Sequence, residues 1–279
     1  MASSSEEKKV WDDATQTFHG GQDWKFLSNF TEDFSHLPLL LMGNGASELI
    51  DLVIRSVPSG GWRPGGTLTQ YKDAALTCLV NPTNPTGDYL DVEAMKRYIE
   101  TYCPDNHTII VDESMQPWVG PHWRADSLIH QRDWTKIWSC TGLRIGSVVA
   151  PTAAHAAKIK QKQVPWSVNS MALVFVSEVV KDTAYMDETW KVTPVWRANL
   201  VDQLAARFPT WEVFGKPYLS WVWVDTKSPD VSEKACALAK QHGVPVRSGK
   251  PGYDLPTFVR IAVRNPEQTN VLLQAWASL

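Results

Sequence analysis

The chain alternates short apolar runs with stretches whose apolar residues recur at helical spacing. The segment ASELIDLVIRSV at 46–57 has the spacing of an amphipathic helix. Three short apolar runs that end in turn residues predict strands at 76–82, 107–114 and 145–151. Strands that alternate with helices in this way predict a parallel sheet covered by helices.

The second half of the chain has a different pattern. Helical patterning dominates from Ser167 to about Arg207. The segments at 218–226, 244–248 and 257–263 then alternate as half-exposed strands around a predicted helix, SEKACALAKQHG. We therefore expect a smaller second domain.

The composition indicates a globular protein. A chain of 279 residues with 43% hydrophobic residues can bury a large core. The net charge of -3 is spread without long blocks of one sign, so we expect no nucleic-acid partner and no membrane anchor. The first residues, MASSSEEKKVWDD, lack the apolar run of a signal peptide, which predicts a cytoplasmic location. Four isolated cysteines without a CxxC pair predict neither a metal site nor a disulfide framework.

Glycines and a hydroxyl group surround the start of the first predicted helix. In MGNGASELI, at 42–50, Gly43, Gly45 and a small residue stand at the start of the helix, and Ser47 lies in its first turn. Backbone amides at a helix start, together with a hydroxyl, form an anion site suited to phosphate. The alternative is an ordinary Asn-Gly turn followed by an ordinary N-terminal serine.

Two polar residues follow predicted strands. In NPTNPTG, at 81–87, two prolines restrict the loop that presents Asn84. In HTIIVDES, at 107–114, Asp112 follows the apolar run and ends the strand. A carboxylate there lies at the carboxyl edge of a parallel sheet, where ligands usually bind. The alternatives are a plain turn for Asn84 and a cap of the next segment for Asp112.

A lysine and an arginine stand eight residues apart in TKIWSCTGLRIGS, at 135–147. Lys136 is a candidate nucleophilic amine, and Arg144 is a candidate anion-binding residue. Gly142 and Gly146 would permit close approach of the backbone.

The order of these motifs resembles that of the fold-type-I pyridoxal-phosphate enzymes, the class I and II aminotransferases. The likeness runs from about His19 to Pro266 and includes the late FVRIAVRNPEQ. It is closest to histidinol-phosphate aminotransferases and threonine-phosphate decarboxylases, and FHGGQDW, DFS and PWSVNSMA look like the decarboxylase side. The resemblance implies a three-layer α/β/α large domain of the aspartate-aminotransferase type, with a smaller α+β carboxyl-terminal domain.

The resemblance also implies roles around a pyridoxal 5'-phosphate cofactor. Lys136 would form the Schiff base with the cofactor aldehyde and move the proton at the substrate α-carbon. Asp112 would pair with the protonated pyridine nitrogen. Asn84 would donate to the ring phenolate oxygen, alone, because Met115 stands where many family members have a tyrosine. The phosphate would be bound by Gly45, Ala46, Ser47, Thr135 and Arg144.

Two further residues match substrate-binding positions of the family. Arg260 would bind the substrate carboxylate, since a guanidinium fork suits a carboxylate. Asn169 would contact the same carboxylate. The alternatives are a surface ion pair for Arg260 and a helix cap for Asn169.

The resemblance divides the chain into an arm at 1–36, a large domain at 37–166, and a linking helix with the small domain at 167–279. Near 36, 73 and 134 the chain reads as if segments were absent. At the third place the family delivers its lysine from a strand, yet LIHQRDW does not have a strand pattern. Either the chain is a deletion form or the sequence omits internal segments, and the intact motifs on both sides favour the second.

The implied activity is that of an aminotransferase, which moves an amino group from an amino acid to a 2-oxo acid. A homodimer is expected, because sites in this family are completed by both subunits. One alternative is decarboxylation of an amino acid such as a threonine-phosphate-like one. Another is a truncated homologue without catalysis, since fold alone does not decide function.

Overall fold

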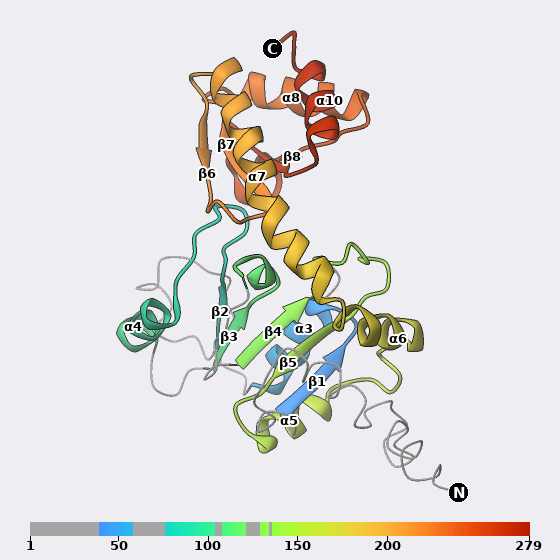
Figure 1. The fold of residues 1–279 in the computed structure, drawn as a ribbon. Coiled ribbons are helices and arrows are strands. Elements are labelled where there is room, and N and C mark those ends of the chain that lie inside the picture. Colours follow the sequence, from blue (N-terminus) through green and yellow to red (C-terminus); the bar gives the residue numbers. More distant parts are fainter. Residues whose placement is uncertain (1–38, 58–75, 104–107, 121–128, 134–135) are drawn as a thin grey trace, which may run out of the picture. The chain divides into compact units, whose positions relative to one another are not determined.

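The computed structural model describes residues 39–57, 76–103, 108–120, 129–133 and 136–279. Their contacts group them into two units, which are drawn in Figure 1. Unit 1 holds the described residues among 1–81, 90–117 and 122–183, and unit 2 holds those among 82–89, 118–121 and 184–279. The predicted division at 166/167 stays a prediction, and the predicted arm at 1–36 lies outside the described residues.

Unit 1 contains a five-stranded sheet in the order β1-β5-β4-β3-β2. Its strands are β1 (Leu40–Gly43), β2 (Leu76–Val80), β3 (Thr108–Asp112), β4 (Ile129–Asp133) and β5 (Gly146–Val149). The pairs β2–β3 and β3–β4 are parallel, but β5 runs antiparallel to both β1 and β4. The prediction of an all-parallel sheet is therefore wrong for β5. Its described connection from β4 consists of turns, and parallel neighbours need a longer crossover, usually a helix.

Strand β4 corrects a second prediction, that the segment before the lysine is no strand. Its sequence, IHQRD, has no apolar run, yet it pairs with β3 and with β5. Two neighbouring strands supply the hydrogen bonds that hold it, so its state depends on tertiary pairing rather than on its own pattern. The three places where segments were thought absent lie within or beside residues that the structure does not describe.

Helix α3 (Ala46–Ser56) matches the amphipathic helix predicted at 46–57. Its buried Leu49, Leu52 and Val53 pack with Ile110 and Val148 of the sheet in one hydrophobic cluster. Helix α5 (Ala153–Lys160) packs against α3 and β1. The remaining helices of unit 1 are α4 (Val92–Tyr102), the 3-10 turn η3 (Gln116–Trp118) and α6 (Ser170–Val179).

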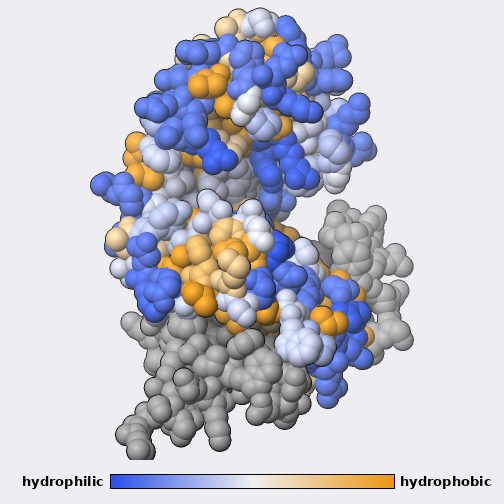
Figure 2. Space-filling model, turned by 90° about the vertical axis from the view of Figure 1, so that its right-hand side faces the viewer, coloured by the Kyte–Doolittle hydropathy of each residue, from blue (hydrophilic) through white to orange (hydrophobic). Residues whose placement is uncertain are grey.

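Helix α6 exposes apolar residues on its outer side. Met171 and Val174 are 74% and 65% exposed, while Ala172 and Val176 are buried. Figure 2 turns the side of Figure 1 that carries α6 toward the viewer, and apolar residues gather on this face. Apolar residues that gather on an exposed face are typical of an interaction surface. None of the helices in the described ranges has the length and apolar character needed to cross a membrane.

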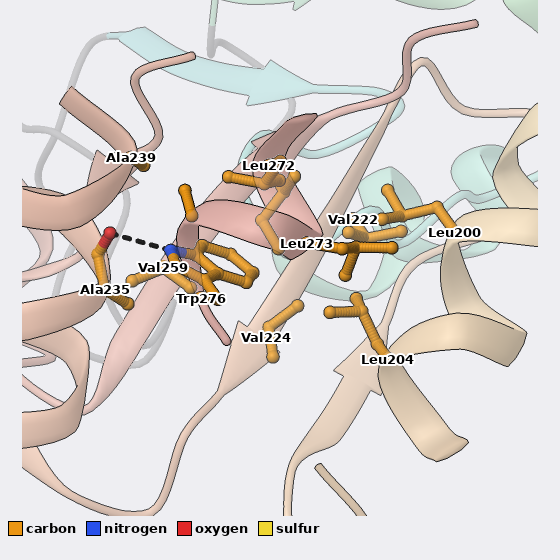
Figure 3. Packing of buried hydrophobic residues seen from close by; sticks show 12 residues of the cluster. Leu200, Leu204, Val222, Val224, Ala235, Ala239, Val259, Leu272, Leu273 and Trp276 are labelled. Carbon is orange, nitrogen blue, oxygen red and sulfur yellow. Dashed lines mark hydrogen bonds between the residues drawn. The ribbon is translucent and has the colours of Figure 1, made fainter. Parts of the chain in front are cut away.

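Unit 2 contains a four-stranded antiparallel sheet in the order β6-β7-β9-β8. Its elements are α7 (Thr183–Arg207), β6 (Glu212–Phe214), β7 (Trp221–Asp225), α8 (Pro229–Gln241), β8 (Arg247–Ser248), α9 (Lys250–Tyr253), β9 (Phe258–Ala262) and α10 (Pro266–Ala275). One face of the sheet, with Val222, Val224 and Ile261, packs on residues of α7, α8 and α10 (Figure 3). Trp276 lies in this core and donates from Nε1 to the Ala235 carbonyl oxygen at 2.9 Å.

The other face of the small sheet is aromatic. Trp223 stacks on Phe258 with ring centroids 4.9 Å apart, and Trp221 donates from Nε1 to the Pro85 carbonyl oxygen at 2.8 Å. The residues from Trp221 to Val224 are all buried, so the prediction of a half-exposed strand is wrong for β7. Both faces of this strand are covered, because Val222 and Val224 pack in the helix-covered core while Trp221 contacts the Pro85 backbone and Trp223 stacks on Phe258.

Candidate functional site

The predicted site residues fall into two sets, one in each unit. Unit 1 holds Gly45, Ala46, Ser47, Asp112, Lys136, Arg144 and Asn169, and unit 2 holds Asn84 and Arg260. Thr135 lies outside the described residues.

The start of α3 has the features of an anion site. Gly45 is the N-cap residue at φ 81° and ψ 169°, a conformation essentially confined to glycine. It provides no side-chain cap, and the first amides of a helix have no partner within the helix itself. Ser47, in the first turn, is exposed. Glu48, also in this turn, accepts a hydrogen bond from the backbone N–H of Asn44.

Arg144 adds a cation at the same place. It lies in the turn before β5 at φ 54°, and its Nη1 donates to the Thr141 carbonyl oxygen at 3.3 Å. Its guanidinium packs so closely on Gly45 that a Cβ atom at position 45 would lie 2.8 Å from Cζ of Arg144. A helix N-terminus and a guanidinium side by side favour an anion with several oxygens, such as a phosphate group.

Asp112 is the last residue of β3 and is half-buried. Its Oδ1 accepts hydrogen bonds from the Ser114 backbone N–H at 2.9 Å and from the Ser114 hydroxyl at 2.5 Å. This is the cap that the sequence left open as an alternative. It occupies one carboxylate oxygen, and an ionised carboxylate has capacity for further donors at the other.

Asp112 also affects a neighbouring thiol. Burial, and to a lesser extent the charge of Asp112, raise the pKa of Cys78 to about 11. A thiol with so high a pKa is a poor nucleophile at neutral pH. Cys78 therefore acts as a packing residue of the sheet.

Lys136 follows the end of β4 by three residues and is half-buried. Its carbonyl oxygen accepts from the Ser139 backbone N–H at 3.1 Å, within the turns that lead to Arg144. A Cβ atom at Gly142 would meet nothing within 4 Å among the described residues, and the close backbone approach expected there stays a prediction.

Asn169 is the N-cap residue of α6. Its Oδ1 accepts from the Ala172 backbone N–H at 2.8 Å, and its Nδ2 donates to the Leu143 carbonyl oxygen at 2.8 Å. This is the helix cap that the sequence analysis kept as the alternative. The cap explains the residue type without a substrate, and the substrate contact of Asn169 stays a prediction.

In unit 2 the structure brings together Asn84 and Arg260, which are 176 residues apart in the sequence. Arg260 Nη1 donates to Asn84 Oδ1 at 2.6 Å. Because a guanidinium has donors only, the amide oxygen of Asn84 must face Arg260, and its Nδ2 is left as a donor. Asn84 lies in the turn at 84–86, which is closed by the hydrogen bond from the Gly87 N–H to the Thr83 carbonyl oxygen at 2.7 Å.

Arg260 is half-buried on β9 and lies directly opposite Trp223 of β7 and Arg247 of β8. Burial lowers the pKa of its guanidinium, Tyr253 acts in the opposite direction, and Arg247 acts in the same direction as burial. No ion pair in the described part of the chain includes Arg260 or Arg247. The surface ion pair considered from the sequence therefore has no partner among the described residues, and the two cations together favour an anion.

Arg247 was not among the predicted site residues. The only signal was its place in VPVRS, which was predicted as a strand. The register that sets it opposite Arg260 depends on strand pairing and could not be predicted from that short segment.

Comparisons with known proteins identify the sequence family of this chain and relatives of known fold. The family model described as "Aminotransferase class I and II" matches residues 67–275. The histidinol-phosphate aminotransferase 1 of Nitrosococcus oceani is 28% identical over 213 residues, which are 71% of this chain and 54% of that protein. A histidinol-phosphate aminotransferase 2 of Haemophilus influenzae is 24% identical over 249 residues, 82% of this chain and 64% of the relative. The chain thus spans little more than half to about two thirds of the length of these relatives.

Solved structures share the fold. The histidinol-phosphate aminotransferase of Clostridium acetobutylicum aligns with a TM-score of 0.77 at 21% identity, covering 96% of this chain and 90% of that one. The L-threonine-O-3-phosphate decarboxylase of Porphyromonas gingivalis aligns with a TM-score of 0.75 at 17% identity, covering 92% and 88%. At these identities the likeness is one of fold, and it confirms the predicted fold class.

Proposed function

The chain belongs to the aminotransferase class I and II family, and from this premise we propose that it is a pyridoxal-phosphate-dependent aminotransferase. The family resemblance stated from the sequence is thereby confirmed. The activity is a proposal because the chain spans only 54% to 64% of the relatives described above. Those relatives are named aminotransferases, which supports this reaction over decarboxylation.

One observation carries the proposal, namely the packing of the Arg144 guanidinium against Gly45 at the start of α3. Pyridoxal phosphate brings a phosphate group, an aldehyde, a pyridine nitrogen and a phenolate oxygen. The residues present fit these groups: Arg144, Ser47 and the first amides of α3 suit the phosphate, and the carboxylate of Asp112 suits the pyridine nitrogen. The amine of Lys136 suits the aldehyde. The remaining donor, Nδ2 of Asn84, suits the phenolate oxygen.

When bound, the cofactor would supply an electron sink for the pair released at the substrate α-carbon. Asp112 would stabilise the positive charge of the ring nitrogen, because a nearby anion favours the protonated form. Ser114 would orient Asp112, since both of its donors hold Oδ1. Lys136 would hold the aldehyde and would move the proton at the α-carbon.

Arg260 would bind the substrate carboxylate. Its guanidinium is half-buried, which strengthens a charged contact, and Asn84 Oδ1 orients it at 2.6 Å. Arg247, opposite in register, adds a second positive charge that attracts an anionic substrate. An amino acid and a 2-oxo acid both carry the carboxylate that this pair of residues would recognise.

We further propose a homodimer in the cytoplasm. The apolar outer side of α6, with Met171 and Val174 exposed, supports an interface with a second copy. The cytoplasmic location rests on the sequence alone and stays a prediction.

The proposal is tested with the purified chain and pyridoxal phosphate. We expect a visible absorption band, and borohydride reduction should attach the cofactor mass to the peptide that contains Lys136. Adding candidate amino acids with pyruvate or 2-oxoglutarate should then yield the exchanged amino acid. The variant Lys136→Ala should lose both the covalent attachment and the exchange.

Each alternative has its own outcome in this experiment. Release of carbon dioxide without amino-group exchange would assign a decarboxylase. A folded chain that binds no pyridoxal phosphate would contradict the proposed function and favour the non-catalytic homologue.

A further inference from the structure

Arg197, in α7, is a buried cation whose partners among the described residues are backbone oxygens. It is 7% exposed, and its Nη2 donates to the carbonyl oxygens of Gly215 at 2.8 Å and Phe214 at 3.0 Å. Its Nε makes a longer contact, 3.4 Å, with the carbonyl oxygen of Trp221. No carboxylate pairs with it among the described residues. An unpaired buried charge is costly, so a leucine or methionine would be the expected residue if the position only filled space.

The turn that Arg197 holds lies against the loop that carries Asn84. Gly215 has φ 100° and Gly87 has φ 78°, and a Cβ atom on Gly87 would lie 2.5 Å from Cα of Gly215. Lys216 N–H donates to the Gly87 carbonyl oxygen at 3.4 Å. The backbone of Gly87 therefore lies in direct contact with that of Gly215, whose carbonyl oxygen accepts from Arg197.

A second contact holds the same loop. Trp221, whose carbonyl oxygen Arg197 reaches, donates from Nε1 to the Pro85 carbonyl oxygen at 2.8 Å and is 4% exposed. The loop is thus held at Pro85 by Trp221 and at Gly87 by the backbone of residues 215–216. Arg197 donates to the carbonyl oxygens of Trp221 and Gly215. Asn84 directly precedes them and accepts the 2.6 Å hydrogen bond from Arg260.

We propose that Arg197 is a positioning residue that keeps the Asn84 amide aligned with Arg260 and thereby sets the affinity for the substrate carboxylate. The inference rests on the proposed function for the role of Arg260. Arg197 itself is buried and donates to backbone carbonyl oxygens, so the proposed role is one of positioning. It acts through the Phe214–Gly215 backbone and through Trp221, and its three donors at fixed angles explain why the residue is an arginine.

The test measures carboxylate binding rather than turnover. The probe is glutarate, which keeps the carbon chain of 2-oxoglutarate but cannot react, titrated into the full chain loaded with pyridoxal phosphate. We expect Arg197→Met to weaken glutarate binding about 10-fold or more, as for the loss of alignment of one charge-assisted hydrogen bond. The matched control is Arg207→Met. Arg207 lies in the same helix and also donates to a backbone carbonyl oxygen, that of Leu273, at 3.2 Å.

A double-mutant cycle separates positioning from general stability. If Arg197 acts through Asn84, then Arg197→Met should add less than about a twofold loss in an Asn84→Ala background, because coupled sites are not additive. Equal glutarate affinity of Arg197→Met and Arg207→Met, or a full additive loss in that background, would overturn the inference. If Arg197→Met does not fold, Arg197→Lys takes its place, with a smaller loss in the same cycle.

Failure of the proposed function has a different signature. Suppose that the wild-type chain binds glutarate, that Arg197→Met weakens this binding, and that the wild-type chain exchanges no amino group. That result would leave the inference standing and reject the aminotransferase activity. A wild-type chain that binds no glutarate would overturn the inference even if pyridoxal phosphate binds.

Discussion

Substituting Gly45 by alanine tests the anion site at the start of α3. Gly45 has φ 81° and ψ 169°, where a side chain is strained whatever the space around it. The new methyl group would lie 2.8 Å from Cζ of Arg144, closer than real Cβ contacts come. The guanidinium must therefore leave, or the first turn of α3 must shift.

The expected effects follow from these two changes. Backbone strain of this kind costs about 1–3 kcal/mol, which should appear as a lower free energy of unfolding. Loss of a hydrogen bond from a charged group costs about 1.5–3 kcal/mol, or roughly 10- to 140-fold in the dissociation constant for pyridoxal phosphate.

The assay compares pyridoxal phosphate with pyridoxal, which lacks the phosphate. Gly45→Ala should weaken the first and leave the second within about twofold, because in the proposed site only the phosphate would contact Arg144 and the start of α3. Gly142→Ala is the matched control, since it adds the same methyl group where nothing lies within 4 Å. A folded Gly45→Ala variant with wild-type affinity for pyridoxal phosphate would refute the reasoning.

Two further predictions concern stability. Trp276→Ala removes a fully buried ring and its hydrogen bond to Ala235. The free energy of unfolding in urea should therefore fall by about 3–5 kcal/mol. The control is Trp166→Ala, at a residue 62% exposed, which should change this free energy by about 0.5 kcal/mol or less. Equal effects of the two would contradict the assignment of the core. The pKa of Cys78 is raised from 9.0 to about 11 in the folded state. The folded state therefore keeps the thiol proton to a higher pH than the unfolded state does. The contribution of the thiol to the free energy of unfolding is lost as pH rises from about 9 to 11. The unfolding free energy should therefore fall less steeply between pH 9 and 11 in Cys78→Ala, and parallel pH curves would show that burial of the thiol has no such effect.

Local patterns predicted much of the fold. The apolar spacing of α3 and the short apolar runs of β2, β3 and β5 appear in the structure at the predicted places. Each of these elements buries some of its own apolar side chains, and that apolar pattern predicts it. Strand β4 was missed, since its sequence is polar and its hydrogen bonds come from β3 and β5.

The candidate site divides in the same way. Gly45 and Asp112 stand at the ends of predicted elements, so their positions followed from the sequence. The bond from Asn169 to the Leu143 carbonyl oxygen and the bond between Asn84 and Arg260 did not, because each depends on which distant backbone or side chain lies nearby.

The sequence by itself determined the family, the order of the motifs and the elements that carry them, because these depend on residue types at short spacing. Only the tertiary structure decided that β5 runs antiparallel, that Arg144 packs on Gly45, and that the buried Arg197 holds the turn beside Gly87. The physical reason is that strand direction, register and the satisfaction of a buried charge are set by partners far along the chain. No local pattern encodes those partners.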